Sequence, residues 1–129
     1  MSLQRTVIAP PAPGLAAGDR QMSMLVRGGD FLFVSGLTAV DPRTGERIRS
    51  TTAGETGQVL ANLKLMLEAA GSSLGKVVKV NVLLSSMLEA QNMNEVFARC
   101  FPEPPPARTV CGARLPDGAK VMIECTALA

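Results

Sequence analysis

The sequence contains no histidine, no tryptophan and no tyrosine among its 129 residues. The lack of histidine excludes Ser-His and Cys-His nucleophiles, the usual zinc sites and histidine acid-base chemistry. Any catalysis must therefore use arginine, carboxylates, hydroxyl groups, backbone groups or bound water. Because four phenylalanines are the only aromatic residues, the core must consist of aliphatic side chains and methionine.

Concentrated charge and paired cysteines are also lacking. The net charge is +2, and basic residues are scattered among acidic ones. Nucleic-acid-binding proteins usually concentrate basic residues beside aromatic side chains that stack on bases, so the composition argues against a nucleic-acid partner. Cys100, Cys111 and Cys125 match neither a disulfide framework nor a zinc pattern. We expect reduced thiols, mostly in the core, and no metal or other cofactor.

Long apolar runs are absent as well. No segment approaches the ~20 apolar residues of a membrane span, and the first residues lack the basic-then-apolar pattern of a signal peptide. We therefore expect a cytoplasmic protein with no membrane partner. A chain of this length fits one domain, residues 1–129, in which residues 1–20, rich in proline and glycine, form an irregular N-terminal arm.

Apolar periodicity and turn residues predict the secondary structure. Capping boxes at Thr52 and Ser86 begin two helices, and Gly71 and Pro102 end them. Alternating or β-branched apolar runs bounded by turn residues predict strands. The predicted strands are 21–26, 31–35, a short edge strand near residue 48, 77–84, 108–114 and 121–127. The resulting order, β-β-β-α-β-α-β-β, predicts an α+β fold with one sheet and two helices covering one of its faces.

A single arginine follows a run of three prolines. Residues 104–106 are proline, and Ala107, Arg108 and Thr109 come next. Proline fixes φ and favours an extended chain, so Arg108 has little conformational freedom. A guanidinium held in this way suits a carboxylate, because its planar donors match two carboxylate oxygens and its charge does not titrate. The alternative is a surface arginine at the beginning of a strand.

Several segments together resemble one protein family. They are residues 62–74, 94–99 and 101–103, the Pro-Ala-Arg-Thr segment at 106–109, and residues 115–119. In order and approximate spacing they resemble the YjgF/YER057c/UK114 family, also called Rid (reactive intermediate deaminase) and, in older usage, L-PSP endoribonuclease. The resemblance extends from about Phe31 to Ala127. It implies a chorismate-mutase-like fold and a homotrimer, in which the sheets surround a central barrel and the active sites lie in clefts between subunits.

The resemblance also implies an activity and a set of site residues. The activity is hydrolysis of enamines and imines, such as 2-aminoacrylate and 2-iminopropanoate, to 2-oxoacids and ammonia. Arg108 matches the arginine that binds the substrate carboxylate, and backbone groups as far as Cys111 would complete that site. Ser35 and Asn94 match a serine and an asparagine of the family. For these two residues, capping a turn and satisfying backbone groups remain open alternatives, as does simple packing for Cys111.

Three departures from the family pattern bear on the site. Met22 stands where the family usually has tyrosine, and Met122 where it has the glutamate proposed to handle water. Glu124, the candidate catalytic carboxylate that remains, lies on the same strand face as Met122 but roughly 7 Å along the strand, so its use would require another geometry. The segment from Arg108 to Leu115 is one residue shorter than usual. We therefore keep three hypotheses: a Rid protein that binds 2-oxo and 2-imino carboxylates and has deaminase activity, a non-catalytic metabolite-binding or regulatory trimer, and, disfavoured, an endoribonuclease.

Overall fold

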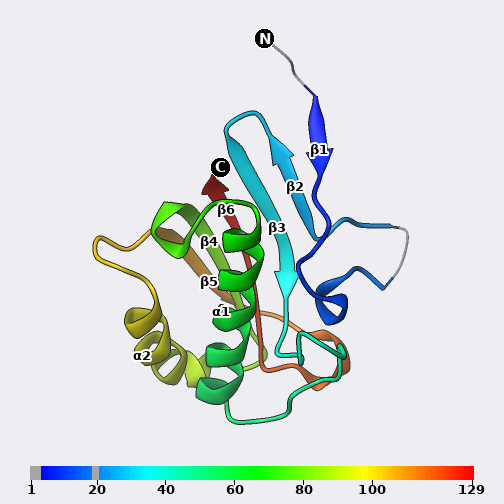
Figure 1. The fold of residues 1–129 in the computed structure, drawn as a ribbon. Coiled ribbons are helices and arrows are strands. Elements are labelled where there is room, and N and C mark those ends of the chain that lie inside the picture. Colours follow the sequence, from blue (N-terminus) through cyan, green and yellow to red (C-terminus); the bar gives the residue numbers. More distant parts are fainter. Residues whose placement is uncertain (1–3, 19–20) are drawn as a thin grey trace.

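A computed structural model describes residues 4–18 and 21–129. Six strands form one mixed sheet with the spatial order β1-β2-β3-β6-β4-β5 (Figure 1). The strands are β1 (Arg5–Val7), β2 (Leu25–Gly28), β3 (Phe31–Leu37), β4 (Val77–Leu84), β5 (Ala107–Gly112) and β6 (Val121–Leu128), and the α-helices are α1 (Thr52–Ala69) and α2 (Ala90–Cys100). Strands β4 and β5 are parallel, and the other neighbouring strands are antiparallel.

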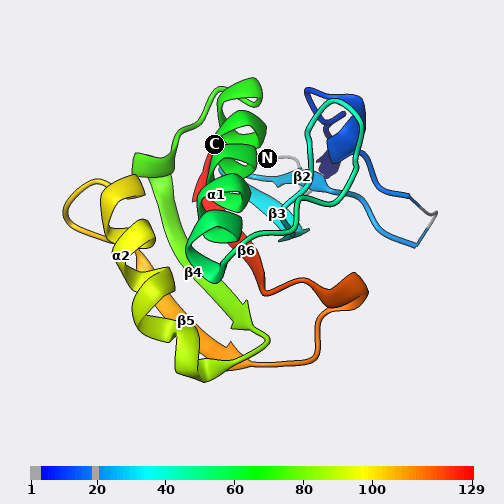
Figure 2. The same cartoon turned by 90° about the horizontal axis from the view of Figure 1, so that it is seen from below.

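Both helices cover the same face of the sheet (Figure 2). The core between the two layers is aliphatic, as the composition predicted, and Phe97 and Phe101 stack at its edge with ring centroids 4.3 Å apart. The opposite face is uncovered in the single chain. Phe31, Phe33 and Leu128 on that face are 41%, 47% and 43% exposed. A group of exposed apolar side chains on one surface commonly marks a site of interaction.

The predicted α+β order is confirmed, but two strands lie elsewhere than expected. No strand forms near Ile48, where a single bridge joins Val40 and Arg47. Instead, β1 forms within the arm that was expected to be irregular, and it pairs with β2. The first predicted strand, 21–26, is shifted to Leu25–Gly28, and its hairpin turn has Gly29 at φ 58°.

The helix boundaries also differ slightly from the prediction. Thr51, not Thr52, caps α1, because its Oγ1 accepts a hydrogen bond from the Gly54 N–H at 3.0 Å. Gly71, with φ +82°, follows the end of the helix as predicted. Helix α2 follows a short 3-10 turn, and Ser86 provides no side-chain cap. Within the described residues, no helix is both long enough and apolar enough to span a bilayer.

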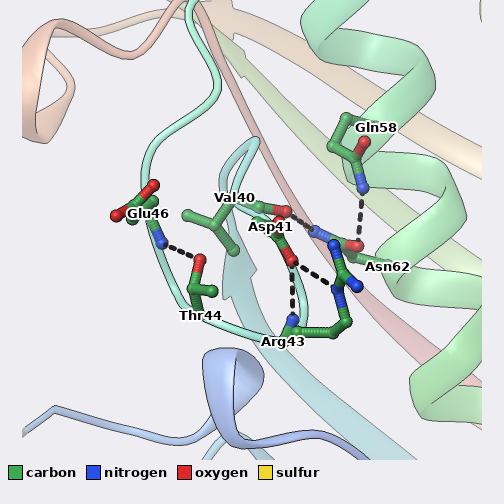
Figure 3. Close-up of polar contacts among 7 residues, drawn as sticks. All are labelled: Val40, Asp41, Arg43, Thr44, Glu46, Gln58 and Asn62. Atoms are coloured by element: carbon green, nitrogen blue, oxygen red, sulfur yellow. Dashed lines mark hydrogen bonds and ion pairs between the residues drawn. The ribbon is translucent and has the colours of Figure 1, made fainter.

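The loop after β3 is attached to α1 and to the N-terminal arm. Figure 3 shows the buried Asn62, whose Nδ2 donates to the Val40 carbonyl at 3.0 Å and whose Oδ1 accepts from Gln58 Nε2 at 3.0 Å. On the other side of the loop, the Gly14 N–H donates to the Pro42 carbonyl at 2.8 Å. A Cβ atom at Gly14 would collide with this loop. The arm, the loop and α1 therefore form one packed unit.

Candidate functional site

Arg108 lies on β5, at the edge of the sheet. In the parallel pairing with β4 it is opposite Val80, which is fully buried under the helices. The Arg108 side chain is therefore on the helix-covered side, where its guanidinium carbon lies 4.8 Å from the centre of the Phe97 ring of α2. A guanidinium over an aromatic face is held by a cation–π interaction. The strand and Phe97 together orient the arginine.

A cavity of about 320 Å³ opens beside Arg108. Its lining residues are Asn94, Phe97, Ala98, Phe101, Glu103, Pro105, Pro106 and Arg108. Asn94 Oδ1 is buried and has no hydrogen-bond partner among the described residues. This oxygen therefore does not satisfy a backbone N–H group, which was the alternative role for Asn94. Among residues 4–18 and 21–129, Arg108 forms no ion pair. An oriented and unpaired guanidinium at a cavity can bind a carboxylate.

Met22 and Met122 line a second cavity, of about 600 Å³. It lies between the N-terminal arm, the loop after β3 and the beginning of β6. Met122 packs over the backbone of Gly36, where a Cβ atom would lie only 2.6 Å from the methionine sulfur. A thioether is a weak acceptor and cannot take up a proton. These two side chains therefore provide contact surface and no acid-base chemistry.

Ser35 and Glu124 line a third hollow, of about 270 Å³, on the uncovered sheet face. Ser35 Oγ donates to the Ser23 carbonyl at 2.6 Å, which fastens β3 to the segment before β2. Glu124 Oε1 accepts a hydrogen bond from Asn81 Nδ2 at 2.8 Å. The Glu124 carboxylate is exposed, and its orientation is set by the neighbouring strand.

Of the three cysteines, one lines a cavity described above: Cys125, in the hollow of Ser35 and Glu124. Cys111 is exposed and, three residues after Arg108, points to the opposite face of the sheet, so it does not line the Arg108 cavity. The expectation that the thiols lie mostly in the core holds for Cys125, which is buried in it, and for Cys100, which is partly buried against it, but not for the exposed Cys111. Burial, with a smaller effect of the nearby Glu124 charge, raises the pKa of the Cys125 thiol to about 12. Cys125 is therefore a packing residue.

Within one chain the predicted site residues are thus divided among three places. Arg108 is beside Asn94, Met22 is in the cavity with Met122, and Ser35 is in the hollow with Glu124. The described residues include no group of three or more Cys, Asp or Glu side chains that could hold a metal ion.

Sequence reasoning missed two further features of these cavities. It counted Phe97 as core and did not identify its contact with Arg108. It also gave no role to Arg47 and Arg49, which line the cavity of the two methionines. Their position there depends on how the loop folds, which no local pattern indicates.

Comparison with known proteins places these features in context. Residues 16–129 match the family model described as Endoribonuclease L-PSP. The chain is 43% identical over 106 residues to a RutC family protein of Pyrococcus horikoshii, covering 81% of this chain and 84% of that protein. It is 33% identical over 127 residues to the chloroplastic Reactive Intermediate Deaminase A of Arabidopsis thaliana, covering 98% of this chain and 67% of that protein. The crystal structure of RidA from the Antarctic bacterium Psychrobacter sp. superposes with a TM-score of 0.83 at 36% identity, covering 90% and 95% of the two chains.

Proposed function

Because the chain belongs to the Endoribonuclease L-PSP family, which includes the YjgF and Rid proteins, we propose that it binds small 2-oxo and 2-imino carboxylates through Arg108. The observation that carries this proposal is the state of that side chain. Its guanidinium is oriented by Phe97, lines a cavity and has no carboxylate partner in the described structure. Fork-shaped donors of this kind bind carboxylates with two parallel hydrogen bonds.

We further propose that the complete site forms between copies of the chain in a homotrimer. Two observations support this assembly. The cavity of Met22 and Met122 is separate from that of Arg108 within one chain, so another copy is needed to bring these residues together. The uncovered sheet face presents exposed Phe31 and Phe33, which association would bury, and soluble homo-oligomers are usually closed by rotational symmetry.

The reaction proposed for this site is hydrolysis of an imine. Water adds to the imine carbon, a proton moves to the nitrogen, and ammonia leaves as the carbonyl of the 2-oxoacid forms. An enamine first tautomerises to the imine. Arg108 would hold the carboxylate next to the reacting carbon and orient it. The water needs a base, and Glu124 is the carboxylate we propose for this role, although its Oε1 already accepts a hydrogen bond from Asn81.

The two methionines favour a second function, binding without catalysis. Positioned acid-base groups typically contribute about 10²–10⁴-fold to a rate, and neither Met22 nor Met122 can act as one. A metabolite-binding or regulatory trimer would use the same Arg108 contact without turnover. Endoribonuclease activity is not proposed, since the sequence has no histidine and only four aromatic residues.

Calorimetry and a coupled assay test these functions together. Titration with 2-oxobutanoate should show saturable binding to the wild-type protein, and an absence of binding would overturn the proposal. Imines generated in situ by an amino-acid oxidase should be hydrolysed slowly or not at all. Met122→Glu should raise that rate, because it adds a carboxylate where the substrate is held. Fast wild-type turnover that disappears in Glu124→Gln would instead show that Glu124 activates the water, and would exclude the binding-only function.

A further inference from the structure

The cavity of Met22 and Met122 also contains two arginines that the proposed reaction does not use. Arg47 and Arg49 both line it, from the loop after β3. Arg47 Nη2 lies 3.5 Å from Asp117 Oδ2, and Arg49 Nη1 donates to the Asp117 carbonyl at 3.3 Å. Asp117 lies in the left-handed region with φ 55° in the turn before β6, and its contacts with the arginines use one carboxylate oxygen and its backbone carbonyl.

The positive charge of this pair is only partly compensated. Among the described residues, one carboxylate, that of Asp117, opposes the two guanidiniums, and its side chain is 79% exposed, which weakens its attraction through solvent screening. The Arg47 side chain is only 15% exposed, and its Nη1 is a buried donor without a hydrogen-bond partner among the described residues. A buried charged donor without a partner is costly, and native structures usually satisfy such groups with water or a ligand.

The loop that carries the two arginines is held in place from several sides. Asn62 of α1 binds the Val40 carbonyl (Figure 3), and Val40 forms a bridge with Arg47. The Gly45 N–H donates to the Asp41 carbonyl at 2.7 Å, and Gly14 of the arm binds Pro42. Groups held in this way lose little conformational entropy when a ligand binds. The backbone that carries Arg47 is therefore held in place at the cavity that Arg47 and Arg49 line.

The size and the lining of the cavity indicate the kind of ligand. Its volume of about 600 Å³ lies within the range of cavities that hold drug-sized ligands, so a three-carbon imino acid would fill only a small part of it. Leu15, Leu37 and Met24 provide apolar walls. A ligand suited to this cavity has a carbon chain longer than that of a three-carbon imino acid, to contact the apolar walls, and an anionic group at its end, to contact the arginines.

We propose that Arg47 and Arg49 bind a second carboxylate, so that the protein prefers 2-oxo and 2-imino dicarboxylic acids over monocarboxylic acids of the same length. This inference rests on the proposed function, in which Arg108 of another copy binds the first carboxylate. Arg47 and Arg49 are then specificity-determining residues. They select the substrate and take no part in the hydrolysis.

A matched pair of ligands tests the inference. 2-Oxopentanedioate and 2-oxopentanoate have the same chain length and differ only in a terminal carboxylate or methyl group. Calorimetry should show at least about tenfold tighter binding of the dicarboxylate to the wild-type protein, equivalent to about 1.4 kcal/mol. Arg47→Gln and, separately, Arg49→Gln should reduce this ratio severalfold while leaving the affinity for 2-oxopentanoate nearly unchanged.

Arg43→Gln is the matched control, since it removes one positive charge from the same loop on a side chain that is 86% exposed and outside the cavity. It should leave the ratio unchanged. Equal binding of the two acids by the wild-type protein, or an unchanged ratio in folded Arg47→Gln and Arg49→Gln, would overturn the inference while leaving the proposed function intact. If Arg108→Ala does not weaken either acid, or if neither binds at all, the proposed function fails and this inference fails with it. Thermal unfolding of each variant confirms that the loop is still folded.

Discussion

Replacing Arg108 with alanine should remove carboxylate binding without unfolding the protein. Arg108 is exposed at the edge strand β5, and the backbone pairing of that strand with β4 does not depend on its side chain. Within the chain, the substitution removes the cation–π interaction with Phe97. At exposed sites such interactions contribute about 0.5–1 kcal/mol, so the free energy of unfolding should fall by no more than that amount.

The effect on binding should be much larger. Removing one partner of a buried, hydrogen-bonded charge pair commonly costs roughly 2–5 kcal/mol, which corresponds to roughly 30- to 4,000-fold in affinity. Arg108→Lys should fall between the wild type and alanine, because lysine keeps the charge but lacks the planar pair of donors and packs less well on Phe97. This order of the three proteins is specific to recognition by a guanidinium.

Calorimetric titration with 2-oxobutanoate measures these affinities, and light scattering checks the assembly of each variant. Arg99→Ala is the control, because Arg99 is an exposed residue in the last turn of α2 and its replacement removes the same charge outside the cavity. An unchanged affinity in correctly assembled Arg108→Ala would refute the proposed role of this residue. An equal decrease in affinity in Arg99→Ala would show that general electrostatic attraction, not Arg108, accounts for the binding.

Two further predictions concern assembly and pH. Light scattering at micromolar concentration should show a trimer, and a stable monomer or dimer would remove the proposed site between copies. The free energy of unfolding should fall above pH 9, because the Cys125 thiol ionises near pH 9 in the unfolded chain but only near its folded pKa of about 12 in the native one. The contribution is at most about 1.4 kcal/mol per pH unit between these values. Chemical unfolding of Cys125→Ala should show a correspondingly smaller slope, and an identical slope would contradict the burial of this thiol.

The parts of the fold that sequence reasoning predicted are those with local causes. The apolar positions of α1 recur with helical spacing, and Gly71 adopts the positive φ that ends the helix. In place of the strand expected near Ile48, a single bridge joins Val40 and Arg47, and the Val40 carbonyl accepts a hydrogen bond from the Asn62 side chain of α1, a contact that no local pattern indicates. Strand β1 could not be predicted either, since its three residues are all exposed and it is defined only by pairing with β2.

In the candidate site, too, features with local causes could be predicted and features that depend on distant segments could not. Arg108 stands out in the sequence because the prolines and the family spacing surround it. Its contact with Phe97 depends on how α2 packs against β5, and the apolar stripe that contains Phe97 indicated only a core position. The location of Arg47 and Arg49 beside Met122 depends on a loop that folds back against the arm and α1. Contacts of this kind arise only when distant segments pack together.

The most direct test of the central claim is a crystal structure of the protein with 2-oxobutanoate bound. We expect the ligand carboxylate on the Arg108 guanidinium of one copy, with Met22 and Met122 of a neighbouring copy around the rest of the ligand. A ligand bound away from Arg108, or bound to Arg108 with no contribution from a second copy, would contradict the account.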